Sequence, residues 1–540
     1  MRKNSFIEGT IVATMGILIV KFIGLIYVIP FNAIIGETGG ALYGYGYNIY
    51  QLFLSISSAG FPFAISKITS EYNALGYNKA IRDTYKISLR IISIISLVAF
   101  VILFVFAPSI GRLILGNSVA NNAWEDVVFV IRCVSFAILV IPFLSVTRGF
   151  LQGHKYITPY SISQIIEQVV RVIIIILGSL VALKVFNLEV KYAVGIAVSA
   201  AFFGGVASYI YLKIKINKNN LLPKGKIIDE KKITKEEIIR KIFTYSIPFI
   251  LISLVNNLYI NIDMILLSRT ISDILSYSNE VRESIVGIYT TWGLKLNSII
   301  LAVSTGLVTS LIPNIVTSFT KKDMDDVNDK FNKALQCVLL VIVPITLFFS
   351  LLSEPIWTLF YGESYYGPIV FKAYVFTALF GGVYSIIVNT LQGINKYKLV
   401  TVTVLMGLMI NGILDVPLMV IADKLNMNVS YGAIFAAFIG YSSSIFTTLY
   451  ILHKKYDFKY NETIKLLPKY ISSWLIFILS IILIKLVIPT NLNSRLLQIP
   501  VLATFGIISF GIYIYTSYKN KNLEKVFGNR VNKIVEKFKK

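Results

Sequence analysis

The sequence predicts an all-α polytopic membrane protein with fourteen transmembrane helices: two six-helix lobes related by internal duplication, plus two extra C-terminal helices. Three observations lead to this fold class. Of the 540 residues, 56% are hydrophobic and only 15% are charged, with a mean hydropathy of +0.72. Apolar runs of about 20 residues, the length at which a helix crosses a bilayer, recur from end to end. Landmarks in one half of the chain also reappear in the other half.

A repeated motif marks the two halves. Leu151-Gln152-Gly153 lies between two apolar runs, and its second copy, Leu391-Gln392-Gly393, does the same 240 residues later. Pro108 and Pro355 each end an apolar run, at a spacing of 247 residues. In a membrane protein, two repeated halves predict a transporter that works by alternating access around a site between them.

The spans follow in order along the chain. They are predicted at residues 9–31, 43–66, 87–107, 127–147, 158–182, 192–212, 244–267, 286–312, 335–353, 370–390, 399–421, 430–452, 471–488 and 497–517. The first six form an N-terminal lobe, the next six a C-terminal lobe, and the last two lie outside the duplication. The predicted parts are therefore an N-terminal lobe (1–213), a basic cytoplasmic linker (214–243), a C-terminal lobe (244–455), the additional pair (456–518) and a basic amphipathic cytoplasmic tail (519–540). A surface helix is expected in the linker from about Thr234. The tail is expected to lie on the anionic inner leaflet, with a solvated tail as the alternative.

The distribution of basic residues predicts the orientation. With the N-terminus inside, the cytoplasmic tails and loops hold 37 of the 51 Lys and Arg residues. The outer loops hold 8 when Lys372, at the outer edge of the tenth span, is counted with them. Positive charge collects on the cytoplasmic side of membrane proteins. Because the predicted span number is even, both termini are expected in the cytoplasm. The same rule accounts for the net charge of +23 without a nucleic-acid partner.

Several other functions find no support in the sequence. Cys133 and Cys337 both lie inside apolar runs, which is typical of core residues rather than of a disulfide or a metal site. No glycine-rich loop ends in Lys-Ser or Lys-Thr, so the chain is not expected to be an ATPase, and no organic cofactor is expected. A membrane glycosyltransferase or polymerase would need a cluster of acid–base groups in an outer loop. The short outer loops contain no such cluster, so the chain is not expected to be an enzyme.

The motifs of the chain resemble those of the MurJ-like flippases, which belong to the MATE-like MOP superfamily. The resemblance is to the Gram-positive branch of these flippases, which includes the stage V sporulation protein B type. The resemblance covers nearly the whole chain. Its motifs are Lys21-Phe22-Ile23-Gly24, Ile29-Pro30, Leu42-Tyr43-Gly44-Tyr45, Ala59-Gly60-Phe61-Pro62, Ile65-Ser66-Lys67 and Arg148-Gly149 with Leu151-Gln152-Gly153.

The resemblance implies two lobes in a V around a central cavity, two extra helices that form a lipid-facing groove, and an undecaprenyl-pyrophosphate-linked saccharide as substrate. It also implies a multi-pass protein of the bacterial plasma membrane. The Gram-negative members have several arginines in the first two spans. This chain has only Lys21 there, so that basic cluster does not carry over.

Charged residues within spans are candidates for substrate binding, because each costs a few kcal/mol to insert. Lys21 lies deep in the first span and is read as a phosphate-binding cation, with a structural ion pair as the alternative. Lys295 is a candidate partner from the eighth span. Glu167 and Arg171 are four residues apart, so they share a helix face and can neutralise each other. Arg132, which can also simply reach the interface, and the polar Asn48 complete the candidate set.

A second set consists of oxygen-bearing side chains. Asn411 and Asp415 are four residues apart in the eleventh span, and Asp263 lies in the seventh. Some MurJ-like relatives hold a sodium ion between these two spans, so the resemblance implies a sodium site at Asp263, Asn411 and Asp415. The alternative is three separate hydrogen-bonded polar residues in a helix bundle.

The sequence therefore predicts a flippase for lipid II, the peptidoglycan precursor. Two alternatives stay open: a flippase for another lipid-linked glycan, such as a capsule, teichoic acid or exopolysaccharide unit, and a MATE-type cation-coupled drug exporter. The expected partners are the lipid-linked saccharide and membrane lipids. Cell-wall synthesis proteins are candidate partners, and the chain is expected to act as a monomer.

Overall fold

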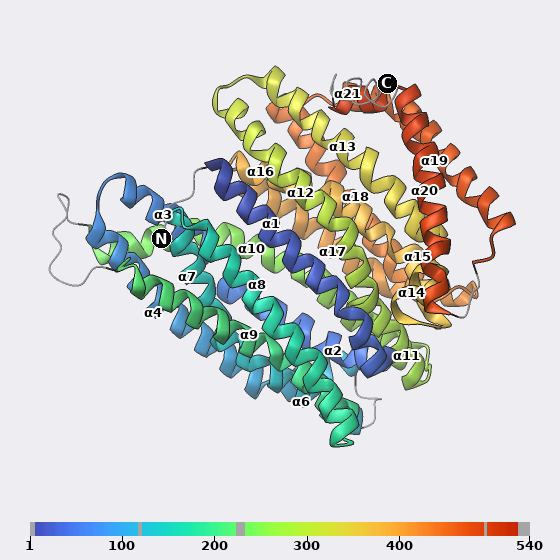
Figure 1. Ribbon diagram of the computed structural model, residues 1–540, viewed down its shortest axis with the longest axis horizontal. Helices are drawn as coiled ribbons and strands as arrows, with labels where there is room; N and C mark the ends of the chain where they lie inside the picture. The colour runs from blue at the N-terminus through green and yellow to red at the C-terminus, as the bar shows by residue number, and fades with distance from the viewer. Residues whose placement is uncertain (1–5, 117–120, 223–232, 491–493, 528–540) are drawn as a thin grey trace. The chain divides into compact units, whose positions relative to one another are not determined.

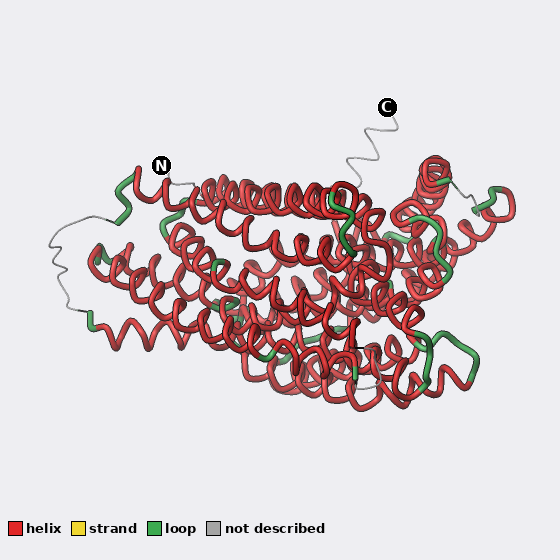
Figure 2. The backbone as a smooth tube through the Cα atoms, turned by 90° about the horizontal axis from the view of Figure 1, so that it is seen from below, coloured by secondary structure: helices red, strands yellow, loops and turns green. Residues whose placement is uncertain are grey.

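The computed structural model describes residues 6–116, 121–222, 233–490 and 494–527, and this part of the chain is helical with no strand (Figure 1, Figure 2). The chain divides into two compact units, a first unit of residues 1–292 and a second unit of residues 293–540. Each unit is described by itself below.

Thirteen helical stretches of the described residues are long and apolar enough to cross a membrane. A shorter apolar stretch, Met15–Ile26, lies where the first span is predicted. The predicted all-α membrane fold is therefore confirmed, while the number fourteen stays a prediction.

The first unit contains eleven α-helices, one 3₁₀-helix (η1) and four π-helical segments (η2 to η5) among its described residues. They are α1 (Phe6–Ile26), α2 (Val28–Ser58), α3 (Phe61–Ala74), α4 (Asn78–Val105), α5 (Ala107–Leu115), α6 (Asn121–Ser135), η1 (Phe136–Leu139), α7 (Ile141–Gly153), α8 (Ile157–Ile173), η2 (Ile174–Gly178), η3 (Val181–Val185), α9 (Val190–Lys218), α10 (Lys235–Arg269), η4 (Thr270–Ile274), α11 (Asn279–Gly287) and η5 (Ile288–Trp292).

Small residues set how closely the helices of the first unit approach. A Cβ atom at Gly16 of α1 would meet Ser161 of α8, and one at Gly24 would lie 3.3 Å from Gln168 Nε2. Since both contacts have nearly the same offset in residue number, α1 and α8 run parallel and side by side (Figure 1). On α7, Gly149 lies against the backbone of Pro62 in α3, so no larger side chain fits between these two helices.

The second unit contains α12 (Gly293–Thr320), α13 (Met324–Leu351), α14 (Ser353–Tyr361), α15 (Tyr366–Tyr374), α16 (Phe376–Gly393), α17 (Tyr397–Lys424), α18 (Ser430–Tyr456), α19 (Asn461–Val487), α20 (Arg495–Lys519) and α21 (Asn522–Phe527). The antiparallel helices α17 and α18 pack closely because two glycines of α18 face α17. A Cβ atom at Gly432 would overlap the backbone at Met419, and one at Gly440 would lie 2.7 Å from the Gly407 carbonyl oxygen.

The two copies of the Leu-Gln-Gly motif end their helices in the same way. After α7, Tyr156 N–H donates to the Leu151 carbonyl oxygen at 2.9 Å, and after α16, Lys396 N–H donates to that of Leu391 at 2.8 Å. Lys155 and Asn395, the residues just before these donors, both have left-handed backbones, with φ of 65° and 59°. The repeated letters therefore correspond to a repeated helix end.

The loop between the halves is described only at its ends. A helix begins at Lys235, where the Thr234 side chain accepts a hydrogen bond from Glu237 N–H at 3.2 Å. It starts where the sequence predicts a surface helix, but it continues without a break to Arg269. Most of the predicted amphipathic tail lies outside the described residues.

Candidate functional site

Three charged side chains of the first unit form a cluster that joins α7 and α8. Glu167 accepts from Arg148 Nη1 at 2.9 Å through one carboxylate oxygen and from Arg171 Nη2 at 2.5 Å through the other. The three side chains are only 13–18% exposed. The pairing of Glu167 with Arg171, predicted from their spacing, is therefore present, and a second arginine joins it. We call Arg148, Glu167 and Arg171 the arginine–glutamate cluster.

Arg148 is also bonded to two serines. Its Nε donates to Ser163 Oγ at 2.9 Å, and its Nη2 donates to Ser208 Oγ of α9 at 3.2 Å. Ser208 in turn donates to the Ser163 carbonyl oxygen at 2.7 Å. The cluster thus fastens α7, α8 and α9 to one another. With two arginines and one carboxylate, it has a net charge of +1.

Three tyrosines of α2, Tyr43, Tyr47 and Tyr50, lie near the guanidinium of Arg171. Tyr43 and Tyr47 stack with ring centroids 5.2 Å apart, and the Tyr47 and Tyr50 rings are 5.7 Å apart. Tyr43 and Tyr50 are buried, whereas Tyr47 is half-buried. Arg171 therefore lies against an aromatic face that is partly accessible.

Lys21 is exposed on α1. Among the described residues, no carboxylate forms an ion pair with Lys21. The alternative interpretation of Lys21, a structural ion pair, therefore finds no support in these residues. The register of α1 on α8 places Lys21 level with about residue 165, roughly six residues before Arg171. That separation corresponds to about 9 Å along the helix axes.

The other predicted substrate-binding residues are not members of the arginine–glutamate cluster. Asn48 is 5% exposed, and its side-chain amide donates to the Thr290 carbonyl oxygen at 3.4 Å, so it holds α2 to η5. Arg132 is exposed, with its guanidinium 5.4 Å from the centre of the Phe104 ring on α4. Lys295 is half-buried on α12 of the second unit. A role in substrate binding stays a prediction for all three.

The predicted sodium ligands are divided between the units. Asp263, in the first unit, is 5% exposed and accepts a hydrogen bond from the Tyr289 hydroxyl at 2.7 Å. Asn411 and Asp415, in the second unit, are fully buried on α17. The side chain of Asn411 faces α18, where a Cβ atom at Gly440 would lie 3.1 Å from its own Cβ. In the part of the chain that the structure describes, no three His, Cys, Asp or Glu side chains are grouped to hold a metal ion.

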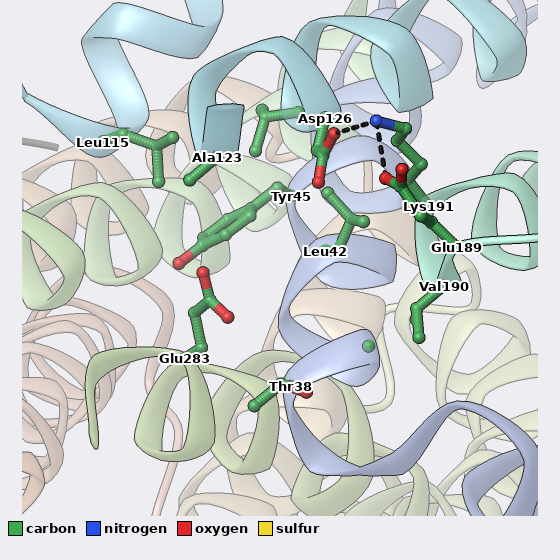
Figure 3. A pocket seen from close by; sticks show the side chains of 12 residues that line it. Thr38, Leu42, Tyr45, Leu115, Ala123, Asp126, Glu189, Val190, Lys191 and Glu283 are labelled. Carbon is green, nitrogen blue, oxygen red and sulfur yellow. Dashed lines mark ion pairs between the residues drawn. The ribbon is translucent and has the colours of Figure 1, made fainter. Parts of the chain in front are cut away.

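A cavity of about 160 Å³ lies in the first unit among α2, α6, α9 and α11 (Figure 3). Asp126, Glu189 and Glu283 line it, but Lys191 already bridges Asp126 at 3.1 Å and Glu189 at 2.8 Å. Ligand pockets usually measure about 300–1,000 Å³. This cavity is therefore too small for a lipid-linked saccharide headgroup. Two of its three carboxylates are already paired with Lys191.

Sequence reasoning misses Arg148 and the tyrosines of α2. Arg148 belongs to a motif of the resemblance, but on sequence alone it is one more basic residue near the cytoplasmic end of a span. Its contact with Glu167 joins two different helices, which no spacing rule predicts. The spacing of the three tyrosines does predict a shared helix face, because Tyr43, Tyr47 and Tyr50 are four and three residues apart.

Comparisons with known proteins identify the family. The sequence profile described as "Polysaccharide biosynthesis protein" matches residues 6–319. The chain is 31% identical over 549 aligned residues to the lipid II flippase MurJ of Bacillus subtilis (strain 168), covering 98% of each chain. Its fold is similar to a solved structure of lipid II flippase MurJ in an inward closed conformation, with a TM-score of 0.68, 17% identity, and 95% of this chain and 99% of that chain covered.

A more distant structure shares the fold as well. It is an inward-facing multidrug resistance MATE family transporter of the MOP superfamily, with a TM-score of 0.61, 12% identity, and 81% of this chain and 96% of that chain covered. The predicted resemblance is thus confirmed along the whole chain. The chain belongs to the polysaccharide biosynthesis protein family and, within it, to the family of the lipid II flippase MurJ.

Proposed function

We propose that the chain is a flippase that moves lipid II, the undecaprenyl-pyrophosphate-linked peptidoglycan precursor, from the inner to the outer leaflet by alternating access. The observation that carries this proposal is the match to MurJ along 98% of both chains. The protein is then a transporter and not an enzyme. It acts as a monomer in the plasma membrane, with membrane lipids and cell-wall synthesis proteins as its partners.

The charges of the first unit suit this substrate. A pyrophosphate is strongly anionic, and an unpaired buried charge is very costly. Lys21 and the arginine–glutamate cluster supply positive charge within helices that are long or apolar enough to lie in the membrane. A drug exporter for cationic compounds would instead need surplus negative charge at this place. The second candidate, a flippase for another lipid-linked glycan, would share the same pyrophosphate chemistry.

Depletion of the protein, followed by lipid analysis of each leaflet, tests the function. Lipid II is expected to accumulate in the inner leaflet, because its synthesis continues while its export stops. Accumulation of a different lipid-linked glycan would move the assignment to that substrate. Unchanged levels of every lipid-linked precursor, in cells shown to lack the protein, would reject a flippase.

We further propose that both termini are cytoplasmic, because the basic residues are concentrated on that side. Asn426 lies between α17 and α18, and Asn395 lies at the opposite end of α17. A cysteine at position 426 should react with a membrane-impermeant maleimide added to intact cells, whereas one at position 395 should react only after lysis. The reverse pattern would invert the topology.

Sodium coupling through Asp263, Asn411 and Asp415 is a further proposal. The burial of Asp263 and Asp415 within membrane helices supports it, since ionisable residues inside spans mark ion pathways. Transport by Asp415→Asn protein should lose any dependence on external sodium, with the amide preserving the shape of the side chain. Sodium dependence equal to that of the wild type would leave Asp415 a structural residue.

A further inference from the structure

We propose that Arg171 contacts the pyrophosphate of the substrate, and that Arg148 is a positioning residue that frees Arg171 for this contact by neutralising Glu167. The proposal rests on the proposed function, because it names the groups that would recognise the substrate's anionic part. It depends on the cluster's hydrogen bonds, its net charge and its surroundings.

The hydrogen bonds of the two arginines differ. Every nitrogen of the Arg148 guanidinium is bonded: Nη1 to Glu167, Nε to Ser163 and Nη2 to Ser208. Arg171 is bonded to Glu167 through Nη2, and its buried Nε has no hydrogen-bond partner. A guanidinium offers five N–H donors. Arg148 therefore uses three of these donors and Arg171 only one, so most of the unused donors of the cluster belong to Arg171.

The charges of the cluster do not balance. Both oxygens of Glu167 are already paired, one with each arginine. One positive charge therefore remains in excess. A cation held within the membrane region is costly unless an anion accompanies it. The cluster is thus arranged to accept one additional negative group.

The surroundings of Arg171 indicate where that group would bind. Tyr43, Tyr47 and Tyr50 lie near the guanidinium, Tyr47 is the half-buried member of the three, and the Arg171 side chain is itself 18% exposed. Phenol hydroxyls can donate to phosphate oxygens. An anion can therefore approach Arg171 on the Tyr47 side.

The planar fork of an arginine matches two oxygens of a phosphate group. Two sources could present such a group: a lipid-linked pyrophosphate or the single phosphodiester of an anionic phospholipid. The pyrophosphate carries more negative charge and fits the excess charge better. It is the ligand to which we assign the site.

Binding of undecaprenyl pyrophosphate to the purified full chain, in phosphatidylcholine nanodiscs, tests the assignment. Arg171→Gln should weaken binding by at least about tenfold, since it removes a charged hydrogen bond. Arg148→Gln should weaken it similarly, because Glu167 then neutralises Arg171. The double variant Arg148→Gln/Glu167→Gln should recover affinity to within about threefold of the wild type, because Arg171 again has an unbalanced charge. Lys184→Gln, which changes an exposed lysine in η3, should bind as the wild type does.

A purely structural cluster gives a different pattern. The double variant would then bind no better than Arg148→Gln, because its bonds to Ser163 and Ser208 are lost in both, and this result would overturn the proposal. Wild-type affinity in Arg171→Gln would overturn it as well. Thermal unfolding of each variant reports folding. If Arg171→Gln does not fold, Arg171→Lys takes its place and should keep the charge but weaken binding.

Two further results separate the possible ligands and the two proposals. Phosphatidylglycerol that displaces the probe at equal concentration would assign the site to phospholipid headgroups and reject the pyrophosphate assignment. If the expected binding pattern appears but depletion leaves lipid II unchanged, the proposed function fails and the anion site stands. If lipid II accumulates on depletion but cells with Arg171→Gln export it normally, only the assignment of Arg171 to pyrophosphate binding is rejected.

Discussion

Lys21→Ala protein should insert and fold but lose transport of the lipid-linked precursor, by about tenfold to a hundredfold relative to the wild type. Lys21 is exposed on α1, and in the described part of the chain no carboxylate neutralises it. A charged hydrogen bond contributes about 1.5–3 kcal/mol, which corresponds to this range in affinity. Alanine favours the helix more than most residues do, so α1 should still form. Complementation of a depletion strain, with lipid II measured in each leaflet, is the assay.

A conservative change gives the control for charge. Lys21→Arg should retain part of the transport, because the positive charge remains while the geometry of its donors changes. Lys184→Ala removes an exposed lysine from the η3 segment that continues α8, and it should complement fully. Full complementation by Lys21→Ala at normal expression would remove Lys21 from the mechanism.

The sequence predicts the local features of the fold well, because they depend on short stretches of chain. Apolar length gives the membrane helices. The spacing of four residues gives the Glu167–Arg171 pair, which the structure contains. The Thr234 cap and the helix that begins at Lys235 also follow from local chemistry.

Contacts between helices could not be predicted in the same way. Arg148 reaches Glu167 from a different helix, so its role depends on how α7 packs against α8. The sequence likewise does not show that the Asn48 side chain bonds to the backbone at Thr290, 242 residues away, and its role in substrate binding stays a prediction. An isolated polar residue in an apolar span can contact a substrate or another helix, and the sequence does not distinguish these outcomes.

Gly40→Ala should destabilise the protein, because Gly40 lies directly against a buried tryptophan. A Cβ atom at Gly40 would overlap the indole of Trp292, whose side chain is fully buried. The Trp292 ring packs against Phe31 with centroids 5.9 Å apart, and Thr291 Oγ1 donates to the Gly40 carbonyl oxygen at 2.8 Å. Neither helix α2 nor η5 can therefore shift without breaking contacts of the other.

The expected change in stability at Gly40 is opposite to the usual effect of a glycine-to-alanine substitution in a helix. Replacing a helical glycine with alanine normally stabilises a helix by up to about 1 kcal/mol. Overpacking a filled site costs about 1–3 kcal/mol or more, so Gly40→Ala should lower the unfolding temperature. The same change at Gly511 of α20, where a Cβ atom meets nothing within 4 Å, should leave it unchanged or raise it. Equal unfolding temperatures for the two variants would show that Trp292 can move aside, and that the contact between α2 and η5 does not depend on glycine.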